Sequence, residues 1–203
     1  MYLPSLYGII DTGYVAEGEL ARVTAALLEG GIGILQFRAK GIEPSRVRDL
    51  AGAIHVLTRA AGVPLILNDY PALAAEIGAE GVHVGQDDAS VEAARALVGD
   101  AALVGKSTHS LAQARAAAAE RVDYIGFGPL FATPTKPGRP AIGTNDLRAV
   151  HEELRLPIYC IGGIKLDNLT VILAAGARRV VIVSGLLQAA DILLYKAHAV
   201  PIG

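Results

Sequence analysis

The sequence predicts an α/β fold, a (β/α)8 TIM barrel that forms a single domain. Three observations predict it. Eight short apolar runs alternate with longer Ala-rich segments, no linker or low-complexity tract divides the chain, and polar residues follow nearly every run. With 203 residues, of which 52% are hydrophobic and 19% charged, the chain is long enough for one large core. We therefore expect residues 1–203 to form one domain.

The apolar runs are too short for helices and too continuously apolar for half-exposed strands. Both properties are typical of parallel strands that are buried on both faces. The eight predicted strands cover residues 6–11, 34–38, 65–68, 81–85, 103–107, 124–128, 158–163 and 179–184.

The segments between the runs have the apolar spacing of amphipathic helices. Pro44 suits the first turn of a helix, Ser110 and Gln113 form a capping-box pattern, and Asp167 or Asn168 can cap another helix. The predicted helices include 44–61, an Ala-rich helix after Ser110, 169–175 and 186–198.

One strand and one helix repeated eight times in 203 residues leaves about 25 residues per unit, near the lower size limit of a TIM barrel. A doubly wound open sheet is the alternative. Eight units without a break in composition favour the closed barrel.

Composition and charge exclude several classes of protein. A balance of 18 basic against 20 acidic residues, net charge −2, argues against a nucleic-acid binder. The longest uncharged stretches, such as 124–135, are shorter than the ~18 residues of a membrane span, and no basic segment precedes an apolar one at the N-terminus. Cys160 is the single cysteine and reads as a buried free thiol. We expect a cytoplasmic protein with no membrane or nucleic-acid partner, and the sequence leaves open whether it is a homo-oligomer.

Polar residues gather where each predicted strand ends, which is where TIM barrels place their active sites. Gln36, Arg38 and Lys40 alternate along the second strand, so their side chains share one face. Two cations on one face of a buried strand are costly without an anion. An anionic ligand is the favoured partner, and a salt bridge to a neighbouring carboxylate is the alternative.

Asp69 and Asp88 follow the third and fourth strands, close enough to share a cation. A small number of hard oxygen ligands suits Mg²⁺, above all when phosphates supply further oxygens. A turn at Asn68–Asp69 and a helix cap at Asp88 are the structural alternatives. His83, inside the fourth strand, is more simply explained as a structural histidine.

Two further features suit phosphate groups. The 133–140 loop contains Thr133, Thr135 and Lys136, and the seventh and eighth strands lead into Gly162–Gly163 and Ser184–Gly185 before helices. In TIM barrels this pair of loops is the usual phosphate site. Two anion sites and a metal indicate two phosphorylated substrates, or one substrate with a phosphate at each end.

Familiar catalytic patterns are missing from the sequence. There is no HExxH, no Walker loop and no readable Ser-His-Asp set. A Lys in mid-strand for Schiff-base chemistry is also missing. Lys106 is nearest to that position, and its side chain should point opposite to that of Ser107.

Taken together, the motifs resemble the thiamine phosphate synthase family. The matching strings are 36–40 (QFRAK), 68–69 (ND), 81–88 (GVHVGQDD), 107–110 (STHS), 126–136 (GFGPLFATPTK), 161–164 (IGGI) and 183–184 (VS). They occur in the family's order along nearly the whole chain. The resemblance implies a TIM-barrel transferase that joins hydroxymethylpyrimidine pyrophosphate to thiazole phosphate, with release of pyrophosphate.

The resemblance also implies roles for individual residues. Gln36 would lie near the pyrimidine, and Arg38, Lys40, Asn68 and Lys136 would hold the pyrophosphate. Asp69 and Asp88 would bind Mg²⁺. Ser107 would lie beside the reacting carbon and share the catalytic roles with Lys136 and Arg38. The thiazole phosphate would contact Thr133, Thr135, Gly163, Val183 and Ser184.

Two other functions remain open. The thiazole tautomerase branch resembles the synthase, but it has a His after the sixth-strand Gly, where this chain has Gly128–Pro129. A non-catalytic barrel that binds a phosphorylated ligand is motivated by departures from the family pattern at Tyr70, Lys106 and Gly185. A binding protein of this kind would not need the metal-assisted leaving-group site that Asp69 and Asp88 suggest, so their presence argues against it.

Overall fold

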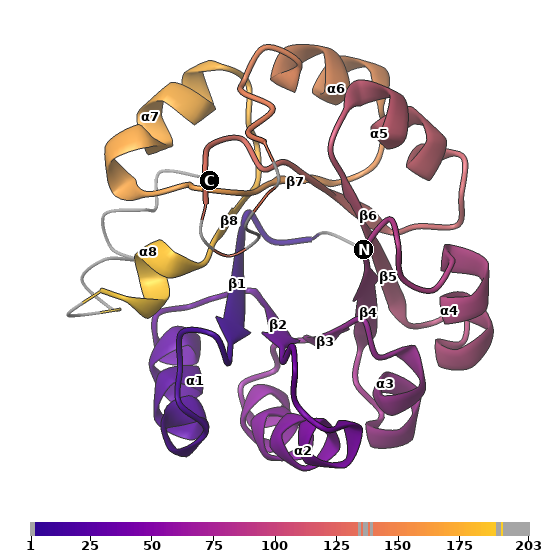
Figure 1. The fold of residues 1–203 in the computed structure, drawn as a ribbon, viewed down its shortest axis with the longest axis vertical. Coiled ribbons are helices and arrows are strands. Elements are labelled where there is room, and N and C mark those ends of the chain that lie inside the picture. Colours follow the sequence, from indigo (N-terminus) through magenta and orange to yellow (C-terminus); the bar gives the residue numbers. More distant parts are fainter. Residues whose placement is uncertain (1–2, 134, 136–137, 139, 190–191, 193–203) are drawn as a thin grey trace.

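The computed structural model describes residues 3–133, 135, 138, 140–189 and 192. Eight parallel strands form a closed barrel in chain order, as the sequence predicts, and Figure 1 looks down this ring with the helices outside it. The strands are β1 Leu6–Asp11, β2 Ile34–Arg38, β3 Leu65–Asn68, β4 Gly81–Val84, β5 Leu103–Thr108, β6 Tyr124–Phe127, β7 Ile158–Cys160 and β8 Val180–Ile182.

Helices cover the outer face of the barrel. They are η1 Glu17–Glu19, α1 Leu20–Glu29, α2 Pro44–Ala60, α3 Pro71–Ile77, α4 Val91–Val98, α5 Leu111–Ala118, α6 Leu147–Glu153, α7 Leu166–Ala174 and α8 Ser184–Leu187. None of the helices in the described part of the chain is long and apolar enough to cross a membrane.

Several predicted boundaries were wrong at the C-terminal ends of strands. β4, β6, β7 and β8 end earlier than the apolar runs do, and β5 continues one residue further, to Thr108. Gly162 and Gly163 have φ of 97° and 65°, a left-handed backbone that cannot continue a strand. The apolar runs therefore include loop residues that turn inward over the barrel.

Two predicted helix starts are also corrected. α7 begins at Leu166 with Lys165 as its N-cap, and Asn168 lies in its first turn, where its Oδ1 accepts a hydrogen bond from the Lys165 N–H at 2.9 Å. The last helix begins at Ser184 instead of residue 186, and most of the predicted 186–198 helix lies outside the described residues. The Ser110 cap is confirmed, since Ser110 Oγ accepts from the Gln113 N–H at 3.2 Å.

Two apolar clusters form the core. The larger fills the layer between the strands and the helices, and includes Cys160, whose burial raises the pKa of its thiol to about 12. The smaller fills the barrel interior around Tyr7, Tyr124 and Tyr159, which pack edge to face with ring centroids 5.1–5.8 Å apart. Gly105 makes room for them, because a Cβ there would collide with the Tyr124 ring.

Candidate active site

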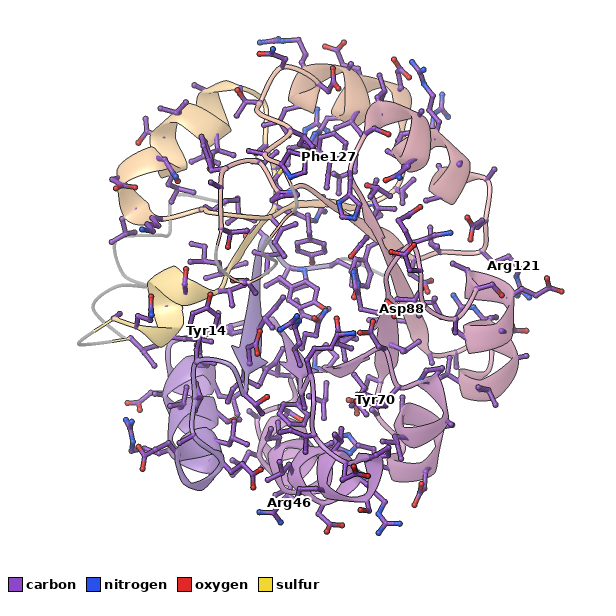
Figure 2. All side chains as sticks on the ribbon, in the orientation of Figure 1. Tyr14, Arg46, Tyr70, Asp88, Arg121 and Phe127 are labelled. Carbon is purple, nitrogen blue, oxygen red and sulfur yellow. The ribbon has the colours of Figure 1, made fainter. Side chains whose placement is uncertain are left out.

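A pocket opens at the C-terminal ends of the barrel strands, above the three tyrosines. Residues from every strand or the loop after it reach this pocket. Of the residues predicted from the sequence, nine line it: Gln36, Arg38, Asn68, Ser107, Thr133, Thr135, Gly163, Val183 and Ser184. Lys40, Asp69 and Asp88 lie outside this lining, and Lys136 lies outside the described residues. In Figure 2, Asp88 is labelled on the β4–β5 side of the barrel and Tyr14 on its β1 side.

Arg38 forms an ion pair at the end of β2, with its Nη1 2.6 Å from Asp11 Oδ2. Asp11 is held in turn by the Gly13 N–H, which donates to Oδ1 at 2.8 Å. The salt bridge that the sequence left as an alternative is therefore present. The buried Nε of Arg38 has no hydrogen-bond partner among the described residues. The Arg38 guanidinium is thus held in place by Asp11 and can still donate hydrogen bonds at the pocket wall.

Two aspartates, Asp69 and Asp88, lie at the ends of β3 and β4, and we call them the carboxylate pair. The Lys40 ammonium contacts Asp69. Asn68 Nδ2 donates to Asp69 Oδ2 at 2.6 Å, and the Gly85 N–H donates to Asp88 Oδ2 at 2.8 Å. Asp88 does not cap α4, since Ser90 Oγ does so by accepting from the Ala93 N–H.

The two carboxyl groups of this pair influence one another. Burial raises the pKa of Asp69, the neighbouring Asp88 carboxyl raises it further, and Lys40 acts in the opposite direction. Asp69 has a left-handed backbone with φ of 68°, which Asp tolerates better than most residues. Two adjacent carboxylates fit a hard divalent cation. The described residues offer no group of three or more His, Cys, Asp or Glu ligands, so other oxygens would have to complete the coordination.

Ser107 and His83 form the part of the pocket wall at β4 and β5. Ser107 Oγ lies 2.9 Å from His83 Nε2, and the Ser107 carbonyl accepts from Gln86 Nε2 at 2.6 Å. Lys106 points opposite to Ser107, as predicted, and it is Lys106 that faces away from the pocket, with its Nζ 2.6 Å from Glu120 Oε1. His83 has a partner on each ring nitrogen, as the structural interpretation predicts, and it also lines the pocket.

Glycines bring the loops after β6 and β7 into contact. The Leu130 N–H donates to the Ile161 carbonyl at 2.9 Å, and the Phe131 N–H donates to the Gly162 carbonyl at 3.0 Å. A Cβ on Gly163 would lie 2.7 Å from the Phe131 Cβ, so this approach needs glycine. Asn168 Nδ2 donates to the Gly163 carbonyl at 2.9 Å, which ties this loop to α7.

The predicted loop near Thr133 and Thr135 closes one side of the pocket. Tyr14, from the loop after β1, has its hydroxyl 2.7 Å from Thr135 Oγ1. Thr135 Oγ1 also accepts from Thr133 Oγ1 at 3.2 Å. Two loops far apart in sequence are therefore linked over the pocket.

Comparison with known proteins gives a consistent result. The family model for thiamine monophosphate synthase matches residues 6–186. The chain belongs to this family. A thiamine-phosphate synthase of Thermus thermophilus is 47% identical over 180 residues, covering 88% of this chain and 86% of the relative. The thiamine-phosphate synthase of Herpetosiphon aurantiacus is 43% identical, and the match covers 92% of this chain and 90% of the relative. The solved thiamine phosphate pyrophosphorylase from Pyrococcus furiosus has 27% identity and a TM-score of 0.87, covering 98% and 94% of the two chains.

The departures from the pattern of the thiamine monophosphate synthase family lie outside the pocket lining. The Tyr70 hydroxyl donates to the Ala39 carbonyl at 3.3 Å, and Lys106 pairs with Glu120. Neither Tyr70, Lys106 nor Gly185 lines the pocket. The substitutions that motivated a non-catalytic barrel therefore do not change the lining of this pocket.

The residues that the sequence reasoning missed include Tyr7 and Tyr124, which line the pocket, and Tyr14 and Asn168, which hold the loops beside it. Tyr7 and Tyr124 could have been found from strand alternation, because they share the inward face with Ile9 and Gly126. Tyr14 and Asn168 carry no local signal, since their roles depend on loops that meet only in the folded barrel.

An Asp11→Asn variant of this synthase-family protein is expected to lose about 2 kcal/mol of unfolding free energy. The substitution leaves the guanidinium of Arg38 next to an amide instead of a carboxylate. Urea unfolding of the variant and the wild type measures the loss. A variant as stable as the wild type would contradict a structural role for the ion pair.

Proposed function

We propose that this chain is a thiamine phosphate synthase. It forms a bond between the thiazole nitrogen and the exocyclic carbon of hydroxymethylpyrimidine pyrophosphate, and the bond from that carbon to pyrophosphate breaks. Thiamine phosphate and pyrophosphate are the products. One observation carries the proposal: a single pocket has a cationic side, which Arg38 lines and beside which Lys40 lies, and a glycine-lined side at β7 and β8.

The cationic side would hold the pyrophosphate. Arg38 and Asn68 face the pocket, and Lys40 lies at its edge beside the carboxylate pair. We assign Lys136, outside the described residues, to the same group from the family pattern. These donors favour the charge that develops on the departing pyrophosphate.

The carboxylate pair would hold Mg²⁺ together with oxygens of the pyrophosphate. When bound, the ion would neutralise negative charge on the leaving group. Asn68 would position Asp69 through its 2.6 Å hydrogen bond, and the Gly85 N–H would position Asp88.

The opposite side would take the thiazole phosphate. Gly163 and Ser184 offer their backbone where the loops after β7 and β8 face the pocket, and Thr133 and Thr135 lie beside them. Ile161, Val181 and Val183 add apolar lining at β7 and β8. An apolar wall would keep water from a pyrimidine cation. The aminopyrimidine stabilises that cation itself, so the reaction needs no strong protein base.

The test is one assay with both substrates, with Mg²⁺ and with excess EDTA. Thiamine phosphate is oxidised to fluorescent thiochrome and quantified. We expect product only with Mg²⁺. Absence of product while thiazole phosphate still binds would overturn the synthase assignment and leave the tautomerase or the non-catalytic barrel. Cytoplasmic location, oligomeric state and a single domain over residues 1–203 stay predictions.

A further inference from the structure

Five polar side chains form a continuous hydrogen-bonded chain across the barrel interior, which we call the relay. Gln36 Nε2 lies 2.8 Å from the Tyr7 hydroxyl, which lies 2.9 Å from the Tyr124 hydroxyl. Tyr124 is 3.2 Å from His83 Nδ1, and His83 Nε2 is 2.9 Å from Ser107 Oγ. The residues of the relay come from β1 and β2 and from β4, β5 and β6, strands that lie on two sides of the barrel in Figure 1.

All five residues of the relay line the pocket, and its three middle residues are buried. Gln36 and Ser107 line the wall where a ligand would lie. Tyr7 and Tyr124 are almost completely buried, with exposed fractions of 2% and 0%. A buried polar network of this kind persists only when its members satisfy one another. The relay is therefore a fixed connection between two groups that would contact substrate.

One order of donors and acceptors uses both tyrosine protons within the relay. Burial raises the pKa of Tyr7 and of Tyr124, so each keeps one proton to donate at neutral pH. In this order the Gln36 amide donates to Tyr7, Tyr7 donates to Tyr124, and Tyr124 donates to His83 Nδ1. His83 then carries its own proton on Nε2 and donates to Ser107 Oγ.

We propose that Tyr7, Tyr124 and His83 are positioning residues that fix which hydrogen-bonding groups Gln36 and Ser107 present to the substrate. Gln36 presents its carbonyl oxygen as an acceptor, because its amide nitrogen is turned toward Tyr7, and the second N–H of that nitrogen stays available as a donor beside it. Ser107 presents its hydroxyl proton as a donor, because its oxygen already accepts from His83. This inference rests on the proposed function for the identity of the substrate.

The resulting polarity matches an aminopyrimidine that carries a pyrophosphate. The amino group supplies the N–H that an amide oxygen accepts, and ring nitrogens or pyrophosphate oxygens accept the serine proton. A 4-oxo analogue would place an oxygen where the site offers an acceptor. The relay thus selects an amino over an oxo substituent, and a buried polar mismatch of this kind is a strong basis for discrimination.

The first test concerns the His83 proton in the free wild-type protein. Two-bond ¹⁵N–¹H correlation spectra of a ¹⁵N-histidine sample report the tautomer, and a His83→Gln variant identifies the His83 signals among the five histidines. We expect the proton on Nε2. A proton on Nδ1 would reverse the relay and overturn the proposal.

The second test uses Tyr124→Phe, with Tyr159→Phe as the matched control. Both changes remove one hydroxyl from the same tyrosine cluster, but the Tyr159 hydroxyl donates to the Pro4 carbonyl at 2.7 Å, away from the relay. We expect Tyr124→Phe to raise the KM for the pyrimidine pyrophosphate about tenfold and to weaken rejection of the 4-oxo analogue. Neither variant should change the KM for thiazole phosphate by more than about twofold.

Equal KM values in the Tyr124→Phe and Tyr159→Phe variants would overturn the positioning role. If the wild type made no thiamine phosphate, the proposed function would fail, while the tautomer measurement on the free protein would still decide the polarity of the relay. If Tyr124→Phe did not fold, Tyr7→Phe would interrupt the relay one link earlier and replace it in the kinetic comparison.

Discussion

An Asp69→Asn, Asp88→Asn double variant is expected to lose Mg²⁺-dependent formation of thiamine phosphate by about a thousandfold or more. The carboxylate pair contributes the two anionic oxygen donors next to the proposed pyrophosphate position, and neutral amides bind Mg²⁺ far more weakly. The thiochrome assay over a range of Mg²⁺ concentrations measures the loss.

The same double variant should keep its stability, which separates a functional from a structural role. Burial and the neighbouring Asp88 raise the pKa of Asp69, so its charged form is disfavoured in the folded protein. Asparagine removes that charge, tolerates the left-handed backbone at residue 69, and can still accept the Gly85 N–H at residue 88. We expect a free energy of unfolding within about 1 kcal/mol of the wild type, or above it.

Asp87→Asn is the matched control for this variant. Asp87 precedes Asp88 in the same loop and is exposed, so the substitution removes one negative charge beside the carboxylate pair without removing either of its members. It should leave the Mg²⁺ dependence unaltered. Comparable activity in the double variant and in Asp87→Asn would contradict the metal site.

A Gly163→Ala variant is expected to raise the KM for thiazole phosphate about a hundredfold and to lose about 3 kcal/mol of unfolding free energy. The new Cβ would lie 2.7 Å from the Phe131 Cβ and 2.8 Å from the Ala132 carbonyl oxygen, so the loops after β6 and β7 would have to separate. That movement disrupts the backbone that we assign to the phosphate. Steady-state kinetics and urea unfolding measure the two effects.

Gly62→Ala controls for the cost of a left-handed alanine alone. Gly62 has φ of 67°, against 65° for Gly163, and nothing lies within 4 Å of a Cβ built there. We expect a loss of about 1 kcal/mol and unchanged kinetics. If both variants had the same KM for thiazole phosphate, the close contact at Gly163 would have no part in binding.

The sequence by itself determined the alternation of strands and helices and much of which side chains face the barrel interior. Continuous apolar runs identified buried parallel strands, and the period of two placed Gln36 and Arg38 on one face and Lys106 opposite to Ser107. The order of the strands in the closed barrel followed from the repeat. These properties are local, because they depend on residues within one element or its neighbour.

Only the tertiary structure decided how the site residues contact one another. Arg38 meets Asp11 across 27 residues of sequence, Tyr7 meets Tyr124 across 117, and Tyr14 meets Thr135 across 121. No period or spacing links such positions. Closing the barrel turns distant strand ends into neighbours, and the glycines between them determine how near they come. His83 reads as structural in its own strand, and it becomes part of the site only when Tyr124 and Ser107 reach its two ring nitrogens.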